Sequence, residues 1–207
     1  MIAGGIYRIK TMQYTVSSKS SQLLERKGLS LGSNFFHIGI LVLFLGHVGG
    51  MLTPVWILDG LGISYPFKQK LAIYLGGGAA VLCLIGLCML IIRRFGSSKV
   101  SRTSSAGDKF VILLILAQLV VGLVSIKFSL RHPGGEETMV FLSWANGLIH
   151  FDPYAYMVVM AVDPVFKIHF LLGLTIFASL PFTRLIHIFR IPLRYAFRPF
   201  LLARRKI

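Results

Sequence analysis

The chain has 207 residues, of which 55% are hydrophobic and only 14% are charged, and its mean hydropathy is +0.76. These values are typical of a polytopic membrane protein and argue against a soluble domain. The formal charge of +15 could suggest a nucleic acid partner, but the Lys and Arg residues lie in short stretches between apolar runs, and no DNA- or RNA-binding motif is present. The cations therefore indicate membrane orientation and contact with anionic lipid or an acidic partner, with no nucleic acid.

Four apolar segments are long enough to cross a bilayer, which takes about 20 residues. They follow a basic, amphipathic stretch, residues 1–33, that has no signal-peptide pattern. Before the fourth segment, residues 131–163 are less apolar and predict an interfacial loop with one short amphipathic helix. The sequence predicts an all-α polytopic membrane helix bundle, a single domain over residues 1–207, whose spans comprise residues 33–57, 71–92, 109–130 and 164–189.

The distribution of Lys and Arg predicts how the spans are oriented. The segment before the first span and the loop 93–109 carry five Lys or Arg each, and the chain from Arg184 onward carries seven. The two loops on the opposite side share the remaining five, together with five of the seven acids. Because cationic loops stay on the cytoplasmic side, we expect both termini in the cytoplasm, a basic cytoplasmic tail over residues 190–207, and location in the cell membrane.

Small residues are frequent in the second predicted span. Gly76, Gly77 and Gly78 are expected to permit close helix packing or the approach of a flat cofactor to the backbone. Cys83 and Cys88 have neither CxxC nor zinc-site spacing, and we interpret them as small apolar fillers.

Two of the spans carry two histidines each, His37 and His47 in the first and His169 and His187 in the fourth. A polar ring inside hydrocarbon is costly, so an intramembrane histidine indicates function. The first and fourth spans run antiparallel in the predicted topology, and His47 lies about 15 Å deeper than His37 at the α-helical rise. Histidines at matching depth are therefore His37 with His187, and His47 with His169.

The spacings along the two spans do not agree fully, because ten residues rise about 15 Å and 18 residues about 27 Å along an α-helix. His169 and His187 are 18 residues apart, which predicts that they share one helix face, whereas His37 and His47 lie roughly 80° apart around their helix. That mismatch requires helix tilt, for which Gly46, Gly49 and Gly50 leave room beside the ring. We expect Pro181 to kink the fourth span and to shorten its reach.

Paired imidazoles on facing helices suit one cofactor class better than the others. Two axial histidines bind haem iron, and haem is flat and apolar enough to lie among helices. Zinc would require a tetrahedral set of four ligands. The alternative is that all four are hydrogen-bonded histidines of a helix core or pore, as in a non-redox transporter or channel with a histidine relay.

Three stretches closely resemble the cytochrome b (gamma) subunit of membrane-bound respiratory nitrate reductase: SSQLLERKGLSLGSNFFHIGILVLFLGHVGGMLTP, FKQKLAIYLGGGAAVLCLIG and FKIHFLLGLTIFASLPFTRLIHIF. The resemblance covers nearly the whole chain from about Gln13. It implies a subunit that anchors an iron–sulfur beta subunit and a molybdenum-containing alpha subunit at the cytoplasmic face. Such a subunit oxidises quinol, menaquinol or ubiquinol, near the outer face and passes electrons inward through two b haems, while nitrate is reduced in a partner subunit.

The resemblance also implies roles for individual residues. His37 and His187 match the ligands of the proximal haem, nearest the iron–sulfur subunit, and His47 and His169 match those of the distal haem. The quinol site lies beside the distal haem, where Lys68 matches a lysine implicated in quinol binding and Gly46 and His47 line the same region. On its own, Lys68 would be interpreted as a snorkelling interfacial lysine.

The chain departs from the family at its N-terminal span. Family members have five spans with the N-terminus outside, whereas this chain keeps only the end of the first, IAGGIYRIKTMQYT, so we expect that span to be truncated or missing, or the start to be misassigned.

The competing function is a cytochrome b anchor of another quinone-linked oxidoreductase, such as a hydrogenase, formate dehydrogenase or sulfur-cycle complex.

Overall fold

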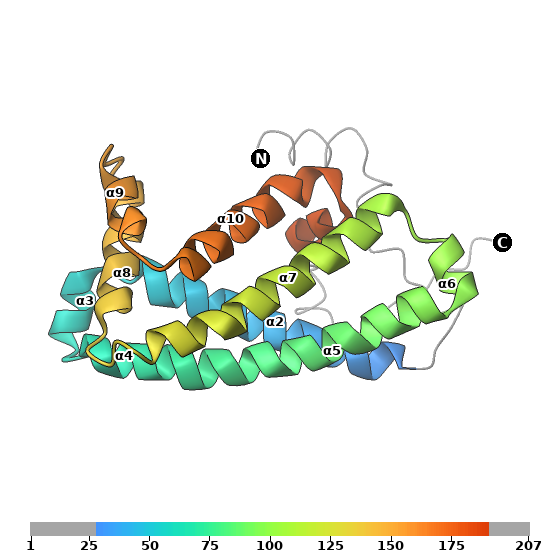
Figure 1. The fold of residues 1–207 in the computed structure, drawn as a ribbon, viewed down its shortest axis with the longest axis horizontal. Helices are drawn as coiled ribbons and strands as arrows, with labels where there is room; N and C mark the ends of the chain where they lie inside the picture. The colour runs from blue at the N-terminus through green and yellow to red at the C-terminus, as the bar shows by residue number, and fades with distance from the viewer. Residues whose placement is uncertain (1–27, 191–207) are drawn as a thin grey trace, which may run out of the picture.

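The computed structural model describes residues 28–190. In this part of the chain, long helices lie side by side, and a shorter pair of helices stands across one end of the bundle (Figure 1). Four helical segments are long and apolar enough to cross a membrane: Leu29–Leu52 (α2), Tyr65–Gly96, Ala106–Ser129 (α7) and Pro164–Phe182. The predicted all-α bundle with four spans is therefore confirmed, and the chain is a multi-pass membrane protein.

The first span is shorter at its C-terminal end than predicted. Helix α2 ends at Leu52, and Thr53 has an extended backbone with φ −71° and ψ 117°. A residue before proline is driven out of the helical region, so Pro54 ends the span and begins a new short helix, α3 (Val55–Gly60). The predicted end at residue 57 is wrong for this reason.

The second span begins earlier than predicted, because three helical elements follow one another without a break. These are α4 (Tyr65–Leu71), a π-helical turn (Ala72–Gly76) and α5 (Gly77–Gly96). Ser64 caps the start by accepting a hydrogen bond from the amide of Phe67. Lys68 thus lies inside the helix and not in the loop 58–70 assigned from hydropathy.

Helices α2 and α5 approach each other at small residues other than those predicted. A Cβ on Gly39 would come within 2.6 Å of the Cβ of Cys83, and a Cβ on Gly86 would overlap the backbone of Phe36. The thiol of Cys83 is fully buried and faces the Phe36 carbonyl at 3.6 Å, as expected for a small filler, whereas Cys88 is exposed. Gly78, in contrast, has no atom near its Cβ position.

Gly86→Ala should destabilise the α2–α5 contact, since the new methyl group has no space against the Phe36 backbone. Overpacking of this kind costs about 1–3 kcal/mol. The measurement is thermal unfolding of the purified protein in detergent, where a lower midpoint is expected. Gly78→Ala is the matched control in the same helix, and it should leave the midpoint unchanged or raise it. Equal midpoints for the two variants would contradict the packing described here.

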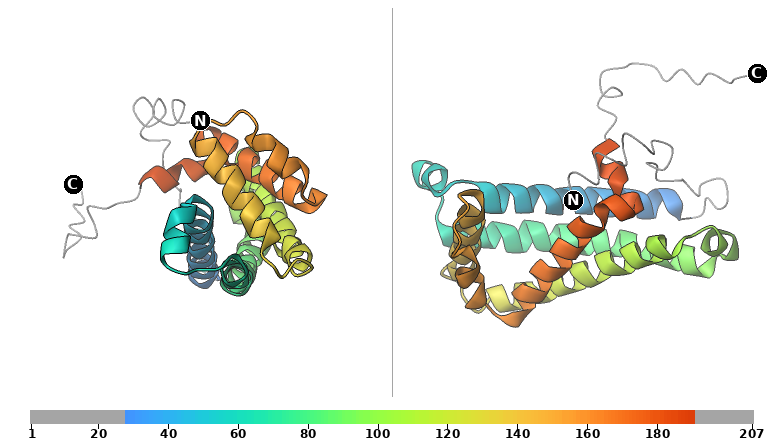
Figure 2. Two further views of the ribbon diagram at one scale, coloured as in Figure 1. Left: turned by 90° about the vertical axis from the view of Figure 1, so that its left-hand side faces the viewer. Right: turned by 90° about the horizontal axis from the view of Figure 1, so that it is seen from above.

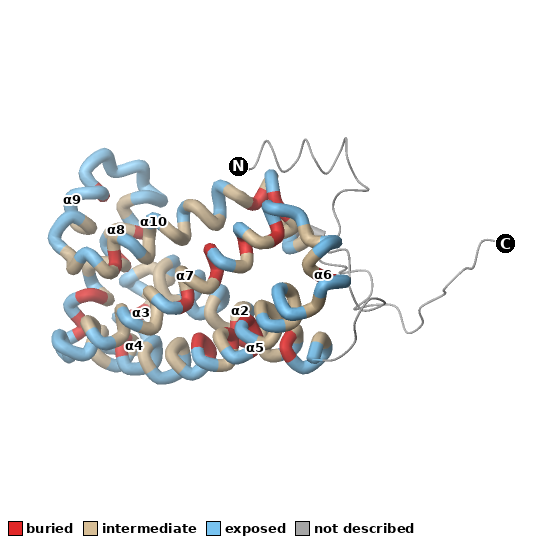
Figure 3. The backbone as a smooth tube through the Cα atoms, turned by 45° about the vertical axis from the view of Figure 1, so that its right-hand side comes forward, coloured by how far each residue is buried: buried red, intermediate tan, exposed pale blue. Residues whose placement is uncertain are grey.

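The other pair of neighbouring long helices is α7 with α10 (Pro164–Ser179). Helix α2 packs mainly on α5, and α10 packs mainly on α7. A contact between α5 and α7 joins the resulting α2–α5 and α7–α10 hairpins. Residues of α5 and α7 form the buried core at this junction: Cys83, Leu87, Val111, Ile115 and Leu119. Helices α2 and α10 have little direct backbone contact, and much of the surface away from the junction is exposed (Figures 2 and 3).

The fourth span is not one continuous helix over residues 164–189. Helix α10 ends at Ser179, a 3-10 turn over Leu180–Phe182 contains Pro181, and a separate 3-10 helix, η4, covers Arg184–Arg190. Proline cannot donate the backbone hydrogen bond of a continuing helix. The expected disturbance at Pro181 is confirmed, but it ends the α-helix, so the prediction that His169 and His187 share one helix face is wrong.

Two helices occupy the segment for which one was predicted, namely α8 (Glu136–Ile149) and α9 (Ala155–Met160). They stand across the end of the bundle where α4 begins (Figure 1). The buried Gln69 side chain donates hydrogen bonds to the carbonyls of Ser129 and His132, at 2.9 and 2.7 Å. These bonds fix the segment between α7 and α8 against α4.

Candidate functional site

Antiparallel helices bring two of the predicted histidines together. Helix α2 runs toward the end of the bundle that carries α3 and α8, and α10 runs away from that end (Figure 1). His47 belongs to the last turns of α2 and His169 to the first turns of α10, so both lie toward this end. Their ring centroids are 6.2 Å apart with an interplanar angle of 30°.

The rings of His47 and His169 come from different helices and lie close together in a stacked orientation. Within residues 28–190, no group of three or more His, Cys, Asp or Glu side chains lies close enough to share a metal ion. Within the described residues the site therefore brings together two imidazoles and no third side chain of these kinds, a set that a haem iron can use.

Three of the four predicted ligands are held in one orientation by the same kind of hydrogen bond. In each, ring atom Nδ1 donates to a backbone carbonyl three or four residues earlier, which leaves Nε2 available to a ligand. The bonds run from His37 to Ser33 (2.7 Å), from His47 to Leu43 (2.7 Å) and from His187 to Arg184 (2.6 Å). His150, outside the spans, makes the same bond to Asn146, so this bond orients a ring without itself identifying a metal ligand.

His169 has a different environment, which is provided by α7. Its Nδ1 is buried and has no hydrogen-bond partner in the described part of the chain, and its Nε2 lies 3.1 Å from the amide nitrogen of Gln118. The amide oxygen of Gln118 is also buried without a partner. Gly122 gives the ring room, since a Cβ there would come within 2.9 Å of its Cε1 atom. Both unpaired atoms can take a further hydrogen-bond partner or ligand.

Sequence analysis did not identify Gln118 or Gly122. A signal for Gln118 was available, because an amide side chain within an apolar span is costly and therefore indicates function. Gly122 carried no such signal, since its role depends on the neighbouring helix.

The structure does not bring the other two histidine rings into contact. His37 lies in α2 and packs edge-on against the Phe36 ring, with centroids 5.3 Å apart. His187 lies in η4, and no ring contact joins it to His37 within the described residues. This pairing therefore stays a prediction from depth and resemblance.

Lys68 is half-buried, and its ammonium group has no partner among the described residues. Its Nζ atom is buried and makes no hydrogen bond to any described residue, whereas Lys70 is exposed. A buried ammonium group is unfavourable unless something pairs with it, so Lys68 has an available donor. Gly46 has no atom near its Cβ position, which leaves open space beside α2 next to His47. No hydrogen bond links Lys68 to Gly46 or His47 directly.

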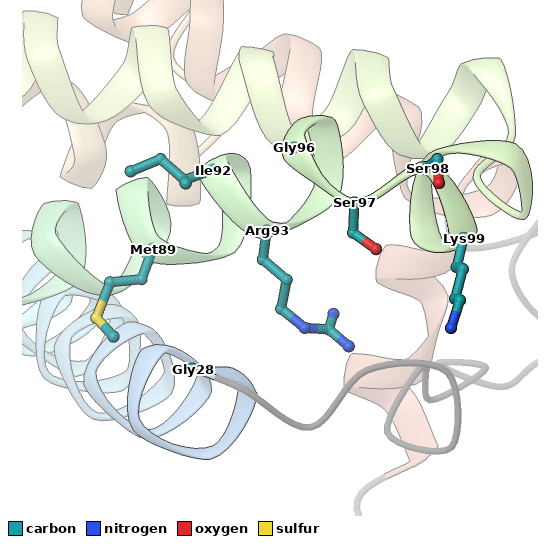
Figure 4. Close-up of a pocket in the computed structure, with 8 residues that line it drawn as sticks. All are labelled: Gly28, Met89, Ile92, Arg93, Gly96, Ser97, Ser98 and Lys99. Carbon is teal, nitrogen blue, oxygen red and sulfur yellow. The ribbon is translucent and has the colours of Figure 1, made fainter.

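A pocket lies at the opposite end of the bundle, between the start of α2 and the end of α5. Arg93 extends from α5 into the space beside Gly28, and Lys99 of α6 (Ser98–Arg102) lies at its edge (Figure 4). None of the four predicted histidine ligands is among the residues that line it. This pocket is therefore separate from the histidine site.

The chain matches known proteins over nearly its whole length. The family model described as nitrate reductase gamma subunit matches residues 1–206. The chain is 40% identical to the respiratory nitrate reductase 1 gamma chain of Escherichia coli, over 99% of this chain and 93% of that one. It is 35% identical to the nitrate reductase gamma chain of Bacillus subtilis, over 99% and 92% of the two chains. An Hdr-like menaquinol oxidoreductase cytochrome b-like subunit of Archaeoglobus fulgidus is 26% identical over 86% of this chain and 52% of its own length. The chain belongs to the nitrate reductase gamma subunit family.

Proposed function

We propose that the chain is the quinol-oxidising dihaem cytochrome b subunit of a respiratory nitrate reductase, with His47 and His169 binding one haem and His37 and His187 the other. The observation that carries the proposal is the pair of facing rings of His47 and His169, contributed by two antiparallel spans of a nitrate reductase gamma subunit family member. Two haems of b type would supply one-electron transfer, which the side chains of this protein do not provide.

The chain's own residues prepare these sites for a flat, apolar group. The Nδ1 bonds of His37, His47 and His187 fix ring orientation, so that the free nitrogen need not be ordered when a ligand binds. Helix α2 also presents exposed apolar side chains, which lipid or a porphyrin face would cover: Leu41, Phe44, Leu45 and Val48.

Lys68 is suited to holding the quinol. Its buried ammonium group can donate a hydrogen bond to a quinol oxygen, and that contact would supply the partner that the side chain lacks. The open space at Gly46 would admit the ring beside His47. Menaquinol and ubiquinol carry the same two oxygens, and either releases two protons and two electrons on oxidation. If the cationic loops face the cytoplasm, the end of the bundle that carries His47 and Lys68 faces outward, and protons released there would leave on the outer side.

The cationic face would bind the soluble partners, an iron–sulfur beta subunit and a molybdenum-containing alpha subunit. Two regions contribute cations there: the loop 93–109, and the tail 190–207, which lies outside the described residues after Arg190. Association between oppositely charged surfaces depends on such clusters.

Deleting residues 194–207 should weaken retention of the soluble subunits at the membrane, because it removes five Lys or Arg from that face. The measurement is the ratio of membrane-bound to soluble nitrate reductase activity at several salt concentrations. Because salt screens the charges that the wild type uses, the difference in retention should be largest at low salt and shrink as salt rises. Replacement of the same five cations by glutamine is the control that keeps chain length. Full retention in both variants would exclude the tail as a docking element.

The proposal is tested first on the purified complex. Extraction should yield two b-type haems per chain, and the reduced spectrum should show b-type bands that appear on addition of quinol. A purified complex without such bands would contradict the haem sites and favour a non-redox histidine relay. A haem-containing chain that co-purifies with subunits other than a nitrate reductase would favour the alternative, a cytochrome b anchor of another quinone-linked oxidoreductase.

A further inference from the structure

A buried ion cluster lies where α5, α7 and η4 meet. Asp108, whose side chain is 4% exposed, belongs to the first turn of α7 and forms a capping box with Ser105. The Nε atom of Arg184 in η4 lies 2.7 Å from its Oδ1 atom, and an Nη1 atom of Arg94, near the end of α5, lies 3.8 Å from its Oδ2 atom. The capping box fixes the carboxylate, because both partners of the box belong to α7 itself.

Arg184 links this cluster to a predicted haem ligand. Its side chain binds Asp108, and its backbone carbonyl accepts the Nδ1 hydrogen bond of His187 at 2.6 Å. A single residue thus connects the fixed start of α7 to the ring of His187. The two bonds constrain the backbone of η4 and the ring together.

The segment that carries His187 needs such a constraint. Pro181 separates η4 from α10, so its position is not set by continuation of the α-helix. A 3-10 helix has poorer hydrogen-bond geometry than an α-helix. Ile186 is fully buried and holds η4 against the bundle, but apolar contacts are not directional. The orientation of η4 about its own axis therefore depends on polar contacts.

We propose that Asp108 is a positioning residue for His187: through Arg184 it fixes the orientation of the imidazole that binds the haem at this end of the bundle. This inference rests on the proposed function, in which His187 is a haem ligand. Asp108 touches neither haem nor quinol in this role. It acts only through the Arg184 ion pair and the Arg184 carbonyl.

The test uses the full membrane complex with both haems. Asp108→Asn keeps the side-chain shape and removes the charge. It should shift the low-spin electron paramagnetic resonance signal and the midpoint potential of the haem that His187→Ala removes, and leave the other haem unchanged. An unshifted signal in Asp108→Asn would overturn the proposal.

Arg184→Gln separates positioning from a simple charge effect. Asp108→Asn and Arg184→Gln remove charges of opposite sign, so a purely electrostatic role would move the potential in opposite directions, and the two shifts would add in the double variant. Positioning predicts that both variants alter the resonance signal in the same way and that the double variant resembles each single one. Additive, opposite shifts with an unaltered resonance signal would overturn the proposal.

Two further variants complete the design. Arg94→Gln removes the more distant partner of Asp108 and leaves the 2.7 Å contact with Arg184, so the resonance signal should stay as in the wild type. Asp108→Glu is the second variant, for the case in which Asp108→Asn misfolds and loses both haems. It keeps the charge but moves the carboxylate, so it should alter only the signal of the haem that His187 binds. An unaltered signal of that haem in Asp108→Glu would overturn the proposal. His187→Ala with both haems retained would refute the ligand assignment itself, and the inference with it.

Discussion

His169→Ala should leave the protein with one haem. His169 contributes one of the two facing imidazoles, 6.2 Å from His47 between centroids, and alanine offers no ligand for a metal at that position. His47→Ala should give the same residual haem, because the two rings form one site. His37→Ala and His187→Ala should both remove the other haem. The measurements are the reduced-minus-oxidised spectrum and a redox titration, which separate the two haems by their bands and potentials.

The control for these variants is His150→Ala. His150 makes the same Nδ1 bond to a carbonyl four residues earlier but is exposed and lies outside the four spans, so both haems should remain. The pairing itself is tested by comparing single variants. If His37→Ala and His47→Ala gave the same residual spectrum and potential, the assignment of two pairs across the antiparallel spans would be wrong.

Lys68→Ala should leave both haem bands intact and slow their reduction by quinol. The Nζ atom of Lys68 is buried without a hydrogen-bond partner in the described chain, and a quinol oxygen would supply one. A hydrogen bond to a charged group contributes about 1.5–3 kcal/mol, which corresponds to roughly 10–150-fold in affinity. Stopped-flow reduction of the haems by a quinol analogue, at several concentrations, measures this loss.

Lys70→Ala is the matched control, since Lys70 is exposed and only two residues away in the same helix. In the Lys70→Ala variant, quinol should reduce the haems at the wild-type rate. Lys68→Arg should restore the rate only in part, because a planar guanidinium cannot take the place of a compact ammonium donor. Wild-type rates in both alanine variants would show that Lys68 is an interfacial anchor, and the quinol site would then lie elsewhere around His47 and His169.

Hydropathy and depth were sufficient to predict the helical framework. The four spans follow from apolar length alone, and the pairing of His47 with His169 follows from rise per residue along antiparallel helices. The face shared by His169 and His187 was predicted wrongly, because a constant helical period was assumed across Pro181. A proline that ends a helix changes the direction of every residue after it, and a count of turns does not include that change.

Contacts between distant residues were beyond the sequence-based argument. Asp108 and Arg184 were counted only as charges for orientation, although they form a buried ion pair. Gln118 and Gly122 shape the surroundings of His169 only because α7 packs on α10. Each of these roles depends on which helices are neighbours, and hydropathy assigns spans without assigning their neighbours.

The sparse contact between α2 and α10 has a consequence for the stability of the bundle. The α2–α5 and α7–α10 hairpins can each pack on insertion, and α2 and α10 then share α8 and the α5–α7 core as neighbours but have little contact with each other. A ligand that binds only the assembled form stabilises that form by mass action. A haem held by His47 and His169, as proposed, would add a direct link between α2 and α10, so the loaded protein should resist separation of the two hairpins more strongly than the unloaded one.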